Sequence, residues 1–302
     1  MKLKSFVLFL ILFRVTYGQE VESKIDKKDL RAFIETLSSI QFEGRDIANN
    51  GQIKTQKFII NRFKTLRIEP FSKAGYLEKF TVNKVKTANV IGVIRGNSEK
   101  SIVVSAHYDH MGWYKKEDAT NARMYYPGAD DNASGVAALL ELAEEFAQYE
   151  NLRYTMIFLA TSAEEAGLLG SLHHVNSPDF DPEKIICNFN LDMISRCDNK
   201  LPDCNYLYCI SDNRSEELDS LTREANKRFS DCTFNYTDYD SDIYYRTDTY
   251  NFSKKGIPSI LFFAGFHDDY HRTTDTIEKI DFDILEKRVK LICEVLKLLQ
   301  KE

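Results

Sequence analysis

The sequence lacks several features that would assign it to other classes of protein. Its six cysteines include no Cys-x-x-Cys pair, which argues against a zinc site built from thiolates. The apolar run near its start, residues 6–13, is far shorter than the roughly 20 residues that a bilayer-spanning helix needs. With a formal net charge of −6 there is no basic excess, so neither nucleic acid nor an anionic membrane is an expected partner. We find no internal repeat or low-complexity tract, and the composition is typical of a globular protein.

The first 18 residues have the pattern of a secretory signal peptide. Lys2 and Lys4 provide a positively charged start, an apolar run follows, and small residues precede a cut after residue 18. The alternative is an anchor that is not removed. We predict that residues 1–18 are removed and that residues 19–302 form a single domain. The protein is then expected to be secreted or periplasmic, to have no contact with a membrane, and to be a monomer.

The apolar periodicity predicts an α/β protein. Helical spacing is found in residues 29–40, 53–66, 136–149, 168–175, 215–229 and 284–299, and strand-like runs in residues 76–82, 88–94, 102–106, 154–160, 185–191, 206–210 and 257–263. Apolar strands that alternate with helices predict a mostly parallel twisted central sheet with helices on both faces. Residues 232–246, rich in Tyr and Asp, are predicted to form a long loop that faces the substrate.

Residues of the kind that bind metal ions follow four of these strands. His107, Glu164-Glu165 and Asp192 come directly or within a few residues after apolar runs, and His271 lies a short loop beyond another. Ligands in open α/β sheets bind beyond the carboxyl ends of the strands, so we expect these side chains to converge. Nitrogen and carboxylate donors from several strand ends are typical of a hydrolytic zinc site. His267, four residues before His271, is the rival ligand in that loop.

Two pairs of residues suggest a division of roles around the metal. His107 and Asp109 are two apart, so on an extended backbone they face the same side. Asp109 can therefore accept the second N–H of the imidazole and leave the other nitrogen to the metal. In Glu164-Glu165, we assign Glu165 as a ligand and Glu164 as the base that takes a proton from water. The alternative for the two glutamates is a favourable interaction with a helix dipole.

A run of small and acidic residues, 128–135, opens the helix predicted at 136–149. Asp130 and Asp131 are flanked by Gly, Ala and Ser, which suggests a backbone packed closely against something compact, such as a pair of metal ions. Asp131 is the better candidate for a carboxylate that bridges two cations, and Asp130 is the fallback. The alternative is an acidic helix cap.

Together these motifs resemble the co-catalytic di-zinc aminopeptidase family, in a superfamily shared with glutamate carboxypeptidases and glutaminyl cyclases. The matching strings are His107-Tyr108-Asp109, Gly128-Ala129-Asp130-Asp131-Asn132-Ala133-Ser134-Gly135, Ala163-Glu164-Glu165-Ala166-Gly167-Leu168-Leu169-Gly170-Ser171, Asn190-Leu191-Asp192-Met193 and His271-Arg272-Thr273-Thr274-Asp275-Thr276. The resemblance implies a zinc-exopeptidase-like α/β/α sandwich and two Zn²⁺ per chain. One ion would be held by His107, Asp192 and Asp131, and the other by Glu165, His271 and the same Asp131.

The resemblance also implies a reaction, the hydrolysis of the first peptide bond of peptides with a free N-terminus. Glu164 would pass the proton of the attacking water to the leaving amine. Tyr270, beside the last histidine, would stabilise the tetrahedral intermediate. Arg246 and Asp248 would line the substrate pocket, with ordinary surface charge as the alternative for both.

Two other functions are consistent with part of this pattern. A glutaminyl cyclase would use one zinc, but it resembles a longer, Trp-containing segment after the acid pair, whereas Trp113 is the only tryptophan here. A binding relative without activity would have lost ligands, and all the expected ligands are present. Outside the site, we expect one loop disulfide among Cys197, Cys204 and Cys209. The sequons at Asn213, Asn235 and Asn251 matter only in a host that glycosylates.

Overall fold

A computed structural model of the chain describes residues 23–117, 120–211, 216–229, 231–236 and 242–301. The predicted signal peptide and the sequon at Asn213 lie outside these ranges. None of the helices within them is long and apolar enough to cross a bilayer.

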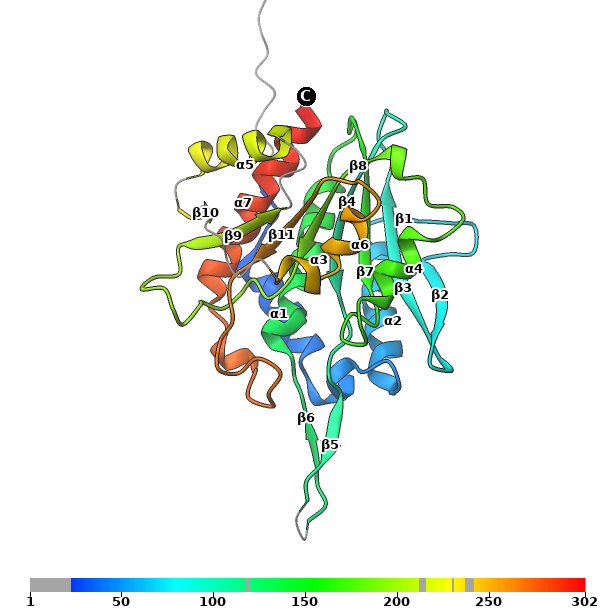
Figure 1. The fold of residues 1–302 in the computed structure, drawn as a ribbon, viewed down its shortest axis with the longest axis vertical. Helices are drawn as coiled ribbons and strands as arrows, with labels where there is room; N and C mark the ends of the chain where they lie inside the picture. Colours follow the sequence, from blue (N-terminus) through cyan, green and yellow to red (C-terminus); the bar gives the residue numbers. More distant parts are fainter. Residues whose placement is uncertain (1–22, 118–119, 212–215, 230, 237–241, 302) are drawn as a thin grey trace, which may run out of the picture.

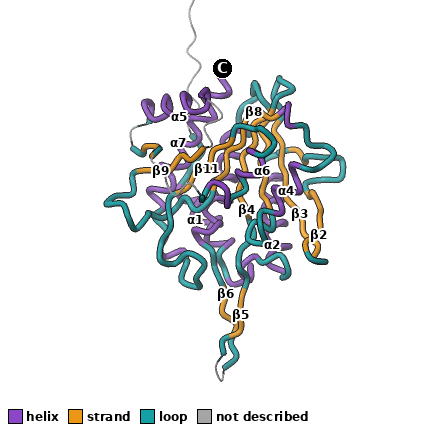
Figure 2. The backbone as a smooth tube through the Cα atoms, viewed as in Figure 1, coloured by secondary structure: helices purple, strands orange, loops and turns teal. Residues whose placement is uncertain are grey.

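A nine-stranded sheet forms the centre of the protein (Figures 1 and 2). Its strands are β1 (Glu69–Pro70), β2 (Leu77–Val82), β3 (Val85–Ile94), β4 (Ser101–His107), β7 (Thr155–Thr161), β8 (Ile185–Leu191), β9 (Tyr206–Ser211), β10 (Thr233–Asn235) and β11 (Ser259–Phe263). They lie in the order β1-β3-β7-β4-β8-β11-β9-β10, and β2 also pairs with β3. The central strands β7, β4, β8 and β11 are parallel, whereas β3 and β9 join them antiparallel.

Helices cover both faces of this sheet. They are α1 (Lys27–Leu37), α2 (Asn50–Thr65), α3 (Gly135–Phe146), α4 (Leu169–Val175), α5 (Glu216–Arg228), α6 (Thr249–Ser253) and α7 (Phe282–Lys301). Short 3₁₀ turns span Ile40–Arg45, Pro182–Lys184, Tyr244–Arg246 and Ile277–Lys279, and a π-helical turn spans Ala129–Ser134. Helix α3 packs against β4, β7 and β8 and against α1, α2 and α7, whereas α4 and α6 pack together on β2, β3, β8 and β11.

The central strands are mostly apolar because both of their faces are buried. In β4, Ile102 and Val104 belong to the large core shared with α3, while Val103 belongs to a smaller core shared with α4 and α6. Burying each such side chain contributes about 1.5–3 kcal/mol. The continuous apolar runs that predicted a parallel sheet are therefore the runs that hold it between its helices.

The first helix follows from its apolar spacing and its cap. The apolar residues at helical spacing from Leu30 to Leu37 are buried. Asp26 caps the helix by accepting a hydrogen bond from the main-chain N–H of Lys28. The buried stripe packs on α3 and α7. It thus joins the N-terminal part of the chain to α3, the helix that follows the acidic run 128–135.

Each predicted helix and strand is present within a few residues of its predicted bounds. The structure adds elements too short to show a period, including β1, α6 and a hairpin of β5 (Trp113–Lys115) and β6 (Arg123–Tyr125) that projects from the body (Figure 1). Residues 232–246 were predicted to be a single loop, and this was wrong in part. The segment contains β10, which pairs in parallel with β9, and a 3₁₀ turn. A three-residue strand carries too little alternation to be recognised.

The loop after β8 contains the predicted disulfide. Cys197 and Cys204 are bonded, while Cys209 lies in β9 and is a free thiol. The prediction of one loop disulfide is confirmed, and the structure selects the pair.

Candidate metal centre

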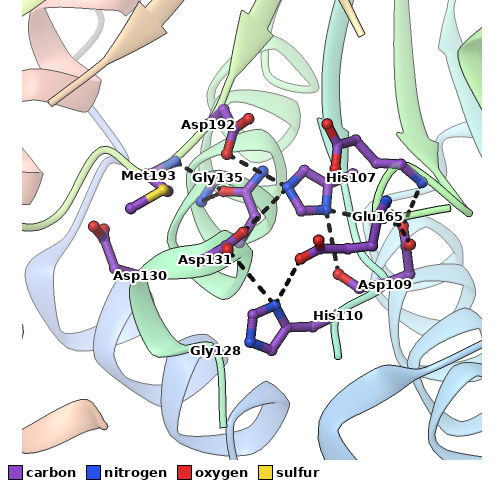
Figure 3. Close-up of polar contacts among 12 residues, drawn as sticks. His107, Asp109, His110, Gly128, Asp130, Asp131, Gly135, Glu165, Asp192 and Met193 are labelled. Atoms are coloured by element: carbon purple, nitrogen blue, oxygen red, sulfur yellow. Dashed lines mark hydrogen bonds and ion pairs between the residues drawn. The ribbon is translucent and has the colours of Figure 1, made fainter. Parts of the chain in front are cut away.

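The predicted ligands converge near the carboxyl ends of the parallel strands, and Figure 3 shows His107, Asp131, Glu165 and Asp192 among them. His107 is the last residue of β4, and Asp192 directly follows β8. Glu165 lies in the turn after β7, and His271 in the loop after β11. Asp131 lies in the π-helical turn that leads into α3. The structure therefore brings together side chains from five separate segments.

Asp131 lies between the other four side chains and directs one carboxylate oxygen to each side. Its Oδ1 is 3.4 Å from Nε2 of His107, which is in turn 3.4 Å from Oδ1 of Asp192. Its Oδ2 is 3.1 Å from Nε2 of His271, which is 3.2 Å from Oε2 of Glu165. The side chains thus form two donor groups that share one carboxylate.

The two donor groups fit zinc. Zinc binds nitrogen and oxygen at about 2.0–2.2 Å in tetrahedral geometry, so two ligand atoms on one ion lie roughly 3.3–3.6 Å apart. The separations of 3.1–3.4 Å between the donor atoms are close to that range. Oδ1 of Asp192 is also buried without a hydrogen bond to any described residue, as expected for an atom that serves a metal.

A further imidazole, His110, lies at the second donor group and was not singled out from the sequence. Its Nδ1 is 3.0 Å from Oε1 of Glu165 and 3.7 Å from Oδ2 of Asp131. Glu165 therefore faces His110 with one oxygen and His271 with the other (Figure 3 shows His110 below Glu165). The sequence feature that could have identified His110 is its position directly after the string His107-Tyr108-Asp109.

The carboxylate of Asp109 does not make the predicted hydrogen bond with the imidazole of His107. Nδ1 of His107 lies 3.2 Å from the main-chain oxygen of Asp109 but 3.8 Å from its carboxylate. The carboxylate instead accepts hydrogen bonds from the main-chain N–H groups of Glu164 and Glu165, at 3.1 and 3.2 Å. The turn after β7 presents two amides to this carboxylate, so Asp109 holds the Glu-Glu pair in place.

The turn that carries Asp131 is fixed by groups from distant segments. The carboxylate of Asp275 accepts hydrogen bonds from the main-chain N–H groups of Asp130 and Asp131. The side chain of Asn132 donates to the carbonyl of Leu191, the residue before Asp192, and accepts from the N–H of Gly135. The string 128–135 therefore links the end of β8 to the loop after β11, and it also supplies a candidate ligand.

The two alternatives left open in the sequence, Asp130 and His267, contact each other instead of the donor groups. Nε2 of His267 is 3.2 Å from Oδ2 of Asp130. The other oxygen of Asp130 accepts hydrogen bonds from the N–H and hydroxyl of Ser195. Figure 3 shows Asp130 directed away from Asp131. The geometry thus favours Asp131 and His271 as ligands.

The charges of the site result from burial opposed by mutual attraction. Burial alone lowers the pKa of His107, but the surrounding carboxylates outweigh it and hold this pKa well above its ordinary value. Burial raises the pKa of Asp131, but the three neighbouring histidines outweigh it and hold this pKa well below its ordinary value. Burial, aided by the charge of Asp192, raises the pKa of Glu164 well above its ordinary value although His107 opposes it. A carboxylate of raised pKa is a better proton acceptor.

A cavity opens above the donor groups and is lined by both polar and apolar side chains. Glu164, Arg246 and Tyr270 line it, and its apolar walls are Met193, Ile243, Phe263 and Phe266. The ring of Tyr270 stacks on that of His271, with 3.8 Å between centroids, and lies tilted against the ring of Phe266 at 4.8 Å. The tyrosine is thereby held beside the second donor group.

Asp248 does not line this cavity. It is buried, and its carboxylate accepts hydrogen bonds from the hydroxyls of Thr161 and Ser171. Asp248 thus joins the end of β7 to α4 behind the Glu-Glu turn, whereas Arg246 lies in the 3₁₀ turn that faces the cavity.

Comparisons with known proteins find relatives of this sequence. The sequence model described as Peptidase family M28 matches residues 89–296. A probable leucine aminopeptidase of Trichophyton verrucosum is 26% identical over 284 residues, which cover 89% of this chain and 70% of the relative. One of Arthroderma otae is 27% identical over 213 residues, which cover 69% of this chain and 55% of the relative. The chain thus spans little more than half the length of the second relative.

Solved structures share the fold at low sequence identity. A zinc aminopeptidase from Bacillus subtilis superimposes with a TM-score of 0.73 at 17% identity, covering 92% of this chain and 96% of that chain. A glutaminyl cyclase of Porphyromonas gingivalis superimposes with a TM-score of 0.71 at 17% identity, covering 92% and 99%. These likenesses confirm the predicted α/β fold with a mixed, mostly parallel central sheet.

Proposed function

The chain belongs to peptidase family M28, and we propose that it is a zinc-dependent aminopeptidase that removes the first residue from peptides. The observation that carries this proposal is the placement of Asp131. Its two carboxylate oxygens face His107 on one side and His271 on the other. A carboxylate shared between two donor groups can bind two zinc ions at once, one through each oxygen.

Each side chain at the centre has a role in this proposal. His107 and Asp192 would hold one ion, His271 and Glu165 the other, and Asp131 both. When bound, the two ions would supply Lewis acidity to the scissile carbonyl and lower the pKa of the attacking water.

Proton transfer is assigned to Glu164. It lines the cavity next to the donor groups, and its main-chain N–H is held by Asp109. The carboxylate would accept a proton from the attacking water and deliver it to the leaving amine. Tyr270, held by its stacking on His271, would donate a hydrogen bond to the carbonyl oxygen as negative charge develops there.

The cavity indicates the substrate. The carboxylates around the donor groups favour a cationic amine, which would restrict cleavage to peptides with a free N-terminus. The walls formed by Met193, Ile243, Phe263 and Phe266 favour an apolar first side chain. The names of the fungal relatives, probable leucine aminopeptidases, support the same choice. Arg246, at the rim of this cavity, would contact the peptide beyond the cleaved bond.

The signal-like first 18 residues and the loop disulfide support a protein that works outside the cytoplasm, either secreted or periplasmic. We propose that it acts there as a monomer. Its substrates would be peptides supplied by endoproteolysis in that compartment.

The test combines metal content with a blocked substrate. Zinc per chain is measured on purified protein, and hydrolysis is compared for leucine p-nitroanilide and its N-acetyl derivative. Two zinc ions per chain and cleavage of the unblocked substrate alone are the expected results. One zinc ion, no amide hydrolysis and cyclisation of a peptide with N-terminal Gln would identify a glutaminyl cyclase instead. Absence of both activities with metal bound would identify a binding relative.

A further inference from the structure

Arg45 is a fully buried arginine in a part of the chain that carries no ligand. It ends the 3₁₀ turn Ile40–Arg45 with a left-handed backbone, φ 56°. The turn precedes α2, more than 60 residues before the first ligand, His107. A buried guanidinium is costly unless all its donors are satisfied, so its partners are informative.

All the donors of Arg45 are used, and each acceptor is a main-chain carbonyl. Nε donates to Tyr108 at 3.0 Å. Nη1 donates to Leu37 at 2.9 Å and to Pro127 at 2.6 Å. Nη2 donates to Gly128 at 2.8 Å and to Asp131 at 3.1 Å. Five acceptors match the five N–H groups of a guanidinium.

Except for that of Leu37, which ends α1, these carbonyls belong to the two segments that supply the shared carboxylate and the first imidazole. Tyr108 follows His107 at the end of β4, and Asp131 is the shared ligand itself. Gly128 directly precedes the π-helical turn, and a Cβ added there would lie 2.6 Å from Nη2 of Arg45 and 2.1 Å from the carbonyl oxygen of Asp131. The guanidinium is therefore packed directly against the backbone of both segments.

We propose that Arg45 is a positioning residue that holds the end of β4 and the Asp131 turn in register and thereby sets the affinity for metal. The proposal rests on the proposed function of the site. The planar guanidinium reaches carbonyls of both segments from one fixed position. A lysine ammonium has three donors on a flexible stem, and it cannot span them all. Without the guanidinium of Arg45, the imidazole of His107 and the carboxylate of Asp131 could move apart. The affinity for zinc would then fall although no ligand is removed.

The chain contains a matched control, Arg288 in α7. It is also fully buried, and its guanidinium also donates to main-chain carbonyls, those of Ile194, Arg196, Cys204 and Tyr206. None of these residues is a candidate ligand. Replacing either arginine by lysine creates the same kind of defect, buried carbonyls without donors, at the same exposure.

The experiment compares zinc binding by metal-free wild type, R45K and R288K, measured by competition with a chromophoric chelator. R45K is expected to weaken binding by about 10–100-fold, the range typical of groups that orient metal ligands. R288K is expected to shift it by about twofold or less. Both variants should lower the midpoint of thermal unfolding. The visible spectrum after Co²⁺ substitution should change in R45K and not in R288K.

A second measurement distinguishes weakened zinc binding from a loss of stability alone. The midpoint of thermal unfolding is followed against zinc concentration, because binding to the native state raises it even in a variant that is partly unfolded without metal. Equal zinc dependence in R45K and R288K, or wild-type affinity in R45K, would overturn the proposal. Failure of wild type itself to bind zinc would instead contradict the proposed function, so the two failures are distinct.

Discussion

Two clusters of acidic side chains lie at opposite ends of α3, and only one has the composition of a zinc site. At the N-terminal end, Asp131 meets Asp192 and the imidazole of His107. In the last two turns, Glu141 and Glu144 meet Asp29 of α1, and these three carboxylates are also close enough to hold one ion. Proximity of acids is thus common to both ends of the helix.

The two clusters differ in what compensates their charge. The carboxylates of the first are interleaved with imidazoles, whose ring nitrogens are common zinc ligands. In the second, Arg62 of α2 forms an ion pair with Glu144, and the main-chain N–H of Asp26 donates to Glu141. Burial raises the pKa of Glu141 to about 8. The negative charge of the second cluster is offset by a proton on Glu141 and by the guanidinium of Arg62. The comparison teaches that the side chains next to the carboxylates, more than the proximity of the carboxylates, make a metal site.

The largest expected effect comes from removing the carboxylate that both donor groups share. Asp131→Asn should lower zinc content from the proposed two ions per chain to less than one, because each group loses an anionic ligand. Hydrolysis of leucine p-nitroanilide should fall to background. Metal analysis and circular dichroism together check this, since the fold should persist. Retention of both zinc ions in this variant would contradict the interpretation that the first cluster, unlike the second, is a zinc site.

The next largest effect separates proton transfer from metal binding within the first cluster. Glu164→Gln should lower kcat by about 10²–10⁴-fold, the range for loss of a general base. Zinc content and KM should stay near the wild-type values, because Glu164 is not in either donor group. Steady-state kinetics with parallel metal analysis measure this. A loss of zinc in E164Q would show that Glu164, and not only Glu165, belongs among the ligands.

A smaller effect distinguishes the two donor groups. The side chain of Asp192 is 11% exposed and that of His271 is 32% exposed. Electrostatic attraction is stronger where water is excluded, so the group of His107 and Asp192 should bind its ion more tightly. The Asp192→Asn variant should then lose the more tightly bound zinc ion, and the His271→Asn variant should lose the more weakly bound one. Stepwise zinc titration of both variants measures this, and equal residual affinities would contradict it.

The smallest effect concerns stability at the second cluster. Because the folded-state pKa of Glu141 is about 8, above its ordinary value of 4.5, the native state holds a proton that the unfolded state releases. Stability should therefore fall as pH rises from about 4.5 to about 8, by on the order of a few kcal/mol, since one pKa unit is about 1.4 kcal/mol. Glu141→Gln keeps an oxygen for the N–H of Asp26 and should flatten this dependence.

Urea unfolding at a series of pH values measures the effect of Glu141→Gln. Activity and zinc content serve as controls and should not change, because the substitution lies at the far end of α3 from Asp131. A wild-type pH dependence that persists in E141Q would show that another group carries the proton.

Much of the site followed from the sequence because its ligands are tied to strand ends. An apolar run that ends in His107 or is followed by Asp192 marks both a buried parallel strand and its carboxyl end. The same local pattern predicted the helices, whose buried stripes are set by residue spacing alone. The β5–β6 hairpin was missed because strands of three residues have no measurable period.

The sequence by itself determined the order of the main elements and the choice of candidate ligands, because both depend on residues within a few positions of each other. Only the tertiary structure decided the contacts between distant segments. Asp109 holds the Glu-Glu turn, His110 faces Glu165, and Arg45 joins the two ligand segments from a turn near the N-terminus. Such pairs are set by how the sheet and its helices pack in three dimensions, and nothing in local spacing records that packing.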